Sequence, residues 1–257
     1  MHFLQIETRR YVQFERLRHE AGLVHAFSTR PLDVASRVGP GVAERTAHRR
    51  TMAGDLGLPG HALRYCQQVH ETRLTVVGAA THDGRLADCD GAVTALPGVP
   101  LMTFSADCPL ILAYDPVRRV LGMAHASWRC TVGHMARHLI ELLHARFECR
   151  PADLRVGIGP GAGPCCYEVK EDVYAAAAEL QDRAQCFVQR DGRLYFDLWS
   201  ANRDQLLVAG VQPDNIEVAG LCTLCHNDVF YSFRRERKGC GHFGLMAALR
   251  EESPNVP

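Results

Sequence analysis

Three short apolar runs in the middle of the chain constrain its fold most strongly. The segment GVPLMTFSADCPLILAYDP (98–116) contains two of them, which are separated at SADCP and closed by a turn at Asp115–Pro116. The third run, RRVLGMAHA (118–126), reaches His125 before polar residues follow. Apolar runs of this length between turn residues predict buried strands.

Segments of strand and helix character alternate along the rest of the chain. We expect strands in GLVHAFSTR (22–30, ending near Ser28), on both sides of His70 in LRYCQQVHETRLTVV (63–77), and in DLRVGIGPG (153–161), NIEVAGLC (215–222) and VFYSFRR (229–235). We expect helices in VAERTAHRRTMAGDLG (42–57), in the apolar repeat from Val132 to Phe147, in VYAAAAELQ (173–181) and in SANRDQLLVAG (200–210). This alternation predicts an α/β or α+β layered fold, with a mixed sheet flanked by helices.

Composition excludes several classes of partner and location. The chain has 257 residues, of which 47% are hydrophobic and 23% charged, as in soluble globular proteins. Lys plus Arg and Asp plus Glu both number 29, so charge gives no reason to expect nucleic-acid or membrane binding. No apolar stretch approaches the roughly 20 residues that span a bilayer. The N-terminal segment is too charged for a signal peptide, so we expect a cytoplasmic protein.

Three metal-capable side chains stand where apolar segments meet loops. They are His70 in QQVHE, Cys108 in SADCP and His125 in AHASW. Two imidazoles and a thiolate suit zinc, and three protein ligands leave a position for water, as in catalytic zinc sites. Such a zinc lowers the pKa of its water towards about 7. The spacing alone is also compatible with ordinary core or surface histidines.

Six motifs in a fixed order resemble the YfiH-like family. They are QQVH, DGAVT, ADCPLIL, AHASWR, GPGAGPCCYEV and FYSFRR, and the likeness extends from about His25 to about Leu249. This family is the multicopper-oxidase-like "laccase domain" family, also described as purine nucleoside phosphorylases.

The resemblance implies a fold, a metal and an activity. It implies a single YfiH-like domain over residues 1–257 and one zinc ion per chain, held by residues matching His70, Cys108 and His125. It also implies phosphorolysis of adenosine, inosine and methylthioadenosine to base and ribose 1-phosphate, and deamination of adenosine. The expected partners are therefore a small nucleoside and phosphate. Asp107, which precedes Cys108, is a further catalytic candidate that either orients a metal ligand, moves a proton or caps a turn.

Side chains near His125 and elsewhere are candidates for substrate binding. Trp128 either stacks on a purine or anchors the core, and Arg129 either binds phosphate or forms a structural ion pair. Arg30, Arg49 and Arg235 are further phosphate candidates, with ordinary surface charge as the alternative.

Several residues depart from the family pattern. Ser127 and Cys130 stand where the family has glycines, Glu71 replaces a glycine after the first histidine, and Pro31, Leu32 and Asp33 follow FSTR where glycines are usual. His242 stands where an Arg is frequent. Since glycine permits close backbone approach, we expect the filled positions to narrow or reshape the pocket.

Other interpretations remain open. Copper-dependent polyphenol oxidation is one, because His and Cys also bind copper. A hydrolase with Cys108 as nucleophile beside His70 or His125 is another, and a zinc-containing binding protein without turnover is a third. The CTLCH segment (222–226) matches a haem attachment pattern, but we expect no haem without export; a separate zinc or redox pair is the alternative there. Cys165 and Cys166 are interpreted as packing residues.

Overall fold

Two large β-sheets pack against each other in the computed structural model, which describes residues 1–35, 41–82 and 84–251. The first has the order β1 (His2–Ile6), β2 (Arg9–Gln13), β3 (Leu23–Ser28), β16 (Phe243–Leu249), β8 (Leu101–Ser105), β4 (Arg64–Cys66) and β6 (Arg85–Leu86). The second has the order β15 (Ile216–Val218), β11 (Arg155–Ile158), β9 (Leu110–Asp115), β10 (Val120–His125), β7 (Gly91–Thr94) and β5 (Leu74–Val76). Both sheets mix parallel and antiparallel pairs, as predicted.

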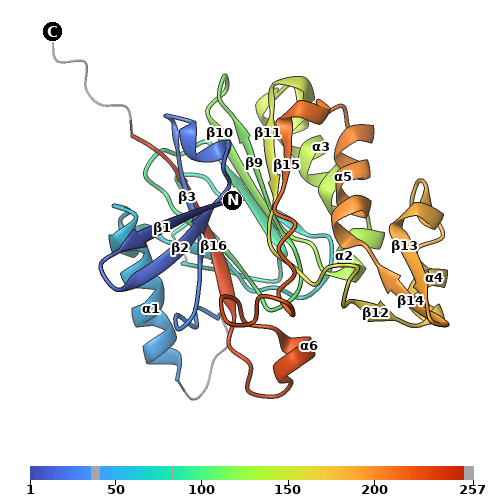
Figure 1. Cartoon of the computed structure of the whole chain (residues 1–257). Helices are drawn as coiled ribbons and strands as arrows, with labels where there is room; N and C mark the ends of the chain where they lie inside the picture. Colours follow the sequence, from blue (N-terminus) through green and yellow to red (C-terminus); the bar gives the residue numbers. More distant parts are fainter. Residues whose placement is uncertain (36–40, 83, 252–257) are drawn as a thin grey trace, which may run out of the picture.

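Helices cover the outer faces of the two sheets (Figure 1). The α-helices are α1 (Val42–Asp55), α2 (Trp128–Val132), α3 (Met135–Phe147), α4 (Glu171–Ala176), α5 (Leu198–Val208) and α6 (Phe233–Glu236). Helix α1 packs on the first sheet, and α3 and α5 pack on the second. A small third sheet, β12 (Glu168–Val169), β14 (Arg193–Phe196) and β13 (Phe187–Arg190), lies beside α4.

The three central apolar runs form β8, β9 and β10, because each of these strands is buried on both faces. Along β10, Leu121 and Met123 contribute to the core between the two sheets, whereas Val120 and Ala124 pack towards α3. Gly122 lies on the α3 side, where a Cβ atom would stand 3.0 Å from Leu139 Cδ1. The α3 helix therefore sits close on β10, and a strand without polar alternation is the result.

Two predicted segments differ from the structure. VFYSFRR (229–235) does not form a strand; it runs into α6, because the Ser232 hydroxyl accepts from Arg235 N and the Glu236 carboxylate accepts from Ser232 N at 2.8 Å. This mutual capping favours a helix start over a strand. The VYAAAAELQ helix begins earlier and ends at Ala176, after which tight turns bury Leu180. The C-terminal strand β16 has no counterpart in the sequence-based prediction.

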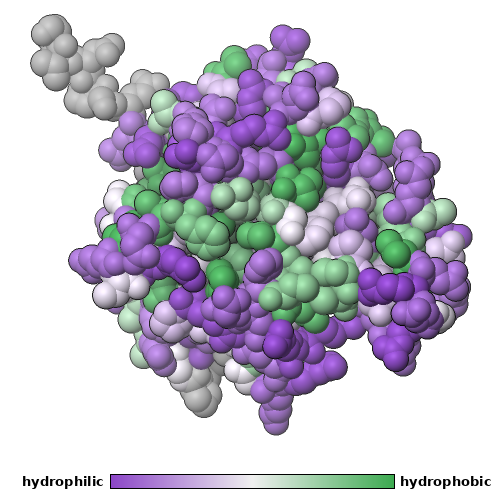
Figure 2. All heavy atoms as spheres, viewed as in Figure 1, coloured by the Kyte–Doolittle hydropathy of each residue, from purple (hydrophilic) through white to green (hydrophobic). Residues whose placement is uncertain are grey.

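The surface is mostly hydrophilic on the face drawn in Figure 2, with hydrophobic residues gathered towards its middle. None of the described helices combines the length and apolar content that a membrane crossing requires.

Candidate metal centre and cavity

Chain connections that cross between the two large sheets bring His70 and Cys108 together. His70 lies between β4 of the first sheet and β5 of the second, and Cys108 lies between β8 of the first and β9 of the second. His125 is the last residue of β10, beside β9. One ligand atom from each of the three residues lies within 4.8 Å of the other two. The structure thus brings together the three residues that the sequence selected.

Asp90 holds the His70 loop and the His125 side chain in place through hydrogen bonds. Its fully buried carboxylate accepts hydrogen bonds from the backbone N–H groups of Val69, His70 and Glu71, each at 3.0 Å, and contacts His125 Nδ1 at 2.9 Å. His70 adopts a left-handed backbone with φ of 63°, which these bonds hold in place. With Nδ1 engaged by Asp90, His125 offers Nε2 as its ligand atom.

The chemistry of the donor set fits a divalent cation. Burial, together with the neighbouring His125, lowers the pKa of His70, which favours the neutral imidazole that binds metals. Burial also raises the pKa of Cys108 well above its ordinary value, and Cys130, Asp107 and Asp90 add to the effect. A half-buried thiolate close to the carboxylates of Asp90 and Asp107 is stabilised by a cation, and a bound metal supplies that charge.

Asp107 holds the backbone beside Cys108. Its carboxylate oxygens accept from Thr223 Oγ1 at 2.7 Å and from Arg234 N at 2.6 Å, and its carbonyl accepts from Ala162 N at 2.6 Å. Its φ of 102° is unusual for a residue with a side chain. Because both carboxylate oxygens are engaged, the geometry favours positioning of Cys108 over proton transfer.

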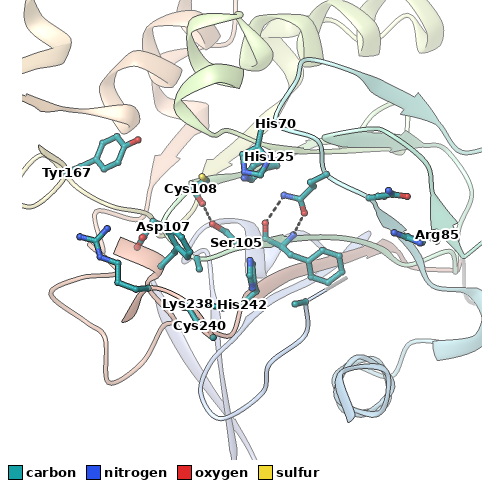
Figure 3. A pocket seen from close by; sticks show the side chains of 18 residues that line it. His70, Arg85, Ser105, Asp107, Cys108, His125, Tyr167, Lys238, Cys240 and His242 are labelled. Atoms are coloured by element: carbon teal, nitrogen blue, oxygen red, sulfur yellow. Dashed lines mark hydrogen bonds between the residues drawn. The ribbon is translucent and has the colours of Figure 1, made fainter. Parts of the chain in front are cut away.

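A cavity of about 650 Å³ opens beside the three candidate ligands. Figure 3 shows His70, His125 and Cys108 close together, with Tyr167 and Arg85 at opposite ends of the view. Aromatic side chains, cations and small polar groups make up its wall, which is lined by Ala35, Gln67, Gln68, His70, Arg85, Phe104, Ser105, Ala106, Asp107, Cys108, His125, Tyr167, Phe233, Arg237, Lys238, Gly239, Cys240 and His242.

A side chain extends the first sheet along one wall of this cavity. Beyond the end of β4, the Gln68 amide donates to Phe104 O at 2.9 Å and accepts from Phe104 N at 2.8 Å (Figure 3, dashed lines). Gln68 therefore takes the place of a backbone neighbour for β8.

The arginines selected from the sequence as phosphate candidates lie outside the described cavity lining. Arg30 pairs with Glu236 and stacks on Tyr231, with its guanidinium carbon 4.0 Å from the ring centroid. Arg49 is buried in the middle of α1 and donates to the carbonyl oxygens of Val34 and Ala35, which follow β3. Arg235 donates to Leu224 O at 2.8 Å. Each guanidinium has a structural partner, which weakens its case for binding phosphate.

Beyond His125, the residues of the AHASWRC segment are not among the described residues that line the cavity. Trp128 packs against the core around the small third sheet, and Arg129 stacks over its ring at 4.4 Å. Ser127 caps α2 by accepting from Cys130 N, and the Cys130 thiol donates to Glu71 O at 3.2 Å. Neither Ser127 nor Cys130 is among the described lining residues, so the expected narrowing of the pocket is not seen there.

Sequence reasoning missed Asp90 and the cations of the cavity. Asp90 begins the DGAVT motif, so its place in an ordered motif set was a usable signal. Arg237 and Lys238 follow the FYSFRR motif in a polar loop, and Arg85 belongs to the short strand β6. Nothing in their local sequence distinguishes them from ordinary surface charges.

Fold and site together define a protein of two layered sheets with a His-Cys-His candidate metal centre at one end. A family model described as "Multi-copper polyphenol oxidoreductase laccase" matches residues 19–250. The chain therefore belongs to this laccase-like YfiH family, as the resemblance predicted.

Named relatives and solved structures agree with this assignment. "Purine nucleoside phosphorylase YlmD" of Geobacillus stearothermophilus is 34% identical over 231 residues, covering 86% of this chain and 84% of that protein. "Adenosine deaminase RL5", from an unknown prokaryotic organism, is 29% identical over 197 residues, covering 73% of this chain and 75% of that protein. The crystal structure of YlmD from Geobacillus stearothermophilus has a TM-score of 0.89 at 30% identity, covering 97% of this chain and 99% of that one.

Proposed function

We propose that this chain is a zinc-dependent purine nucleoside enzyme that carries out phosphorolysis of adenosine, inosine and methylthioadenosine and deamination of adenosine. The observation that carries the proposal is the His70–Cys108–His125 group at the wall of a cavity of about 650 Å³. A cavity of this size accommodates a nucleoside. The names of two relatives, a purine nucleoside phosphorylase and an adenosine deaminase, support the same substrate class.

The roles of the chain's own residues follow from the geometry. His70, Cys108 and His125 would hold zinc, which when bound polarises oxygen atoms and lowers the pKa of water. Asp90 keeps His125 oriented, and Asp107 keeps the Cys108 loop in place.

The substrate-binding roles fall to the wall of the cavity. The aromatic side chains of Phe233 and Tyr167 offer apolar surface to a purine, and Arg237 and Lys238 offer charge to phosphate. In phosphorolysis the bond from ribose C1′ to the base breaks as a phosphate oxygen bonds to C1′. In deamination, water adds at C6 of adenine and ammonia leaves.

Copper is the alternative metal, favoured by the family description and by the ligand types. A blue-copper centre uses a weak axial methionine, and no methionine is among the described residues lining the cavity. A hydrolytic nucleophile would need a lowered thiol pKa, whereas burial raises the pKa of Cys108.

The test is chromatography of a nucleoside panel incubated with the enzyme, with and without phosphate, together with metal analysis. We expect free base only with phosphate, inosine from adenosine without it, and, in His125→Ala, the loss of one zinc per chain along with both activities. His61→Ala, which changes an exposed histidine, is the matched control and should retain both. Copper in place of zinc, or no turnover of any nucleoside, would overturn the proposal.

A second comparison tests the phosphate-binding side chains. Arg237→Ala should raise the KM for phosphate about tenfold, the value of one charge-assisted hydrogen bond. Arg129→Lys should change that KM less, because Arg129 stacks on Trp128 and is not among the described residues that line the cavity. A raised phosphate KM in Arg129→Lys with an unchanged KM in Arg237→Ala would indicate that Arg129 binds phosphate.

A further inference from the structure

Four cysteine thiols meet at a second place in the molecule. Cys165 and Cys166 come from the Gly-Pro-rich loop after β11, and Cys222 and Cys225 come from the loop after β15. The four Sγ atoms lie within 4.8 Å of one another, and all four thiols are free. We call this group the four-cysteine cluster. Cys165 is exposed and Cys166 half-buried, so their interpretation as packing residues is wrong.

The spacing of the sulfur atoms matches a single metal ion. Cys225 Sγ lies 3.7 Å from Cys165 Sγ and 3.5 Å from Cys166 Sγ. Four thiolates around zinc, each with a Zn–S bond of about 2.3 Å, are separated by about 3.8 Å in a tetrahedron. A disulfide would instead require about 2.05 Å. An iron–sulfur cluster also holds inorganic sulfide between its ligands and needs wider separation.

The backbone around Cys222 is arranged to stabilise a thiolate. Gly163 N donates to Cys222 Sγ at 3.4 Å, and the Cys-x-x-Cys turn is closed by a bond from His226 N to Cys222 O at 2.9 Å. Thiolate is the form that binds metal.

The two loops that carry the cluster also contact the wall of the cavity. Gly161 and Cys222 form a bridge, and Thr223 N donates to Gly161 O at 3.0 Å. Thr223 bonds to Asp107, and Tyr167, directly after Cys166, lines the cavity. A metal ion in the four-cysteine cluster would therefore fasten together the two loops behind the candidate active site.

We propose that the four-cysteine cluster binds one zinc ion as a structural site, separate from the His70–Cys108–His125 centre. Four protein ligands leave no position for water, which distinguishes a structural from a catalytic zinc. Binding releases the thiol protons to solvent and changes no oxidation state.

Zinc content of paired variants tests the site. In both the wild-type and the His125→Ala backgrounds, the double variant Cys222→Ser, Cys225→Ser should contain one zinc per chain less than its parent. Cys186→Ala, which removes a buried thiol from the core around the small third sheet, is the control and should keep all zinc. Since the loss is measured without activity and in the absence of His125, failure here is distinct from failure of the proposed function. Unchanged zinc content in the double variant would overturn the site.

A measurement on the intact cluster covers the case in which the double variant does not fold. In His125→Ala protein loaded with zinc, the exposed Cys165 and Cys225 should resist iodoacetamide, and a chelator should make both reactive. Replacement of zinc by Co²⁺ should give the intense visible absorption of tetrahedral cobalt thiolates. Equal alkylation with and without zinc, a disulfide among the four cysteines in the purified protein, or iron at one per chain would overturn the proposal.

Discussion

Replacement of Asp90 by Asn should weaken metal binding although all three candidate ligands remain. Asn keeps one oxygen, which can still accept from His70 N and His125 Nδ1. Its amide group cannot accept from Val69 N and Glu71 N, which now bond to the second carboxylate oxygen at 3.0 Å. The variant therefore retains all three candidate ligands but loses the anchor of the loop that carries His70.

The size of the effect follows from these two lost bonds. A hydrogen bond to a charged group contributes about 1.5–3 kcal/mol, so two give about 3–6 kcal/mol. Relaxation of the loop places the expected loss in unfolding free energy near the lower end, about 3 kcal/mol. Domains of ordinary stability, about 5–15 kcal/mol, remain folded after such a loss. Loss of a group that orients a ligating histidine lowers metal affinity about 10- to 100-fold.

Two assays measure the loss of unfolding free energy and the loss of zinc affinity separately. Urea unfolding of metal-stripped protein gives the stability, and competition with a chromophoric chelator gives zinc affinity, with His125→Ala protein providing the background. Asp115→Asn is the matched control, because Asp115 is equally buried and accepts from Val117 N and Arg118 N in the turn after β9. Both bonds end on Oδ1, which Asn retains, so this variant should lose less stability than Asp90→Asn and keep wild-type zinc affinity. Wild-type zinc affinity in Asp90→Asn, or an equal loss in Asp115→Asn, would refute the reasoning.

Four further outcomes follow. Burial raises the pKa of Glu236, but Arg30 and neighbouring donors have the larger opposite effect and lower it to about 2. The stabilisation from Glu236 is therefore present above pH ~4.3 and is lost as pH falls through 2. Glu236→Gln should cost about 1–2 kcal/mol at pH 7 and about half as much at pH 3 in urea unfolding. Gly122→Ala should cost about 1–3 kcal/mol by the same method, because its methyl group would press on Leu139. Ser127→Gly with Cys130→Gly should cost about 1–3 kcal/mol without changing zinc content or relative nucleoside rates, since neither residue lines the described cavity. Residues 1–257 should give one calorimetric transition, as we propose a single domain; two transitions would contradict it.

Local residue patterns and the order of motifs were sufficient to predict the central strands and the three candidate ligands. The apolar runs of β8, β9 and β10 were recognisable because both faces of these strands are buried. His70, Cys108 and His125 were recognisable because their motifs occur in a known order. Strand order could not be predicted, since β16 reaches its place between β3 and β8 only through long-range pairing.

Residues whose role depends on tertiary contact stayed hidden. Arg30 and Arg49 read as free cations in the sequence, but Glu236 and backbone carbonyls hold them in the fold. Cys165 and Cys225 stand 60 positions apart, so only the pairing of two loops shows that they meet. Asp90 belongs to a recognised motif, but its role depends on hydrogen bonds from the loop around His70, which the sequence does not show.

The side chain of Gln68 has a consequence for selectivity. The Gln68 amide bonds to both polar backbone atoms of Phe104 and so satisfies the hydrogen-bonding groups at this edge of β8, beside the cavity. A ligand therefore finds no vacant main-chain donor or acceptor at Phe104, and discrimination along this wall depends on side-chain shape and charge. Relatives could change substrate by exchanging such side chains while the strand beneath them keeps its course.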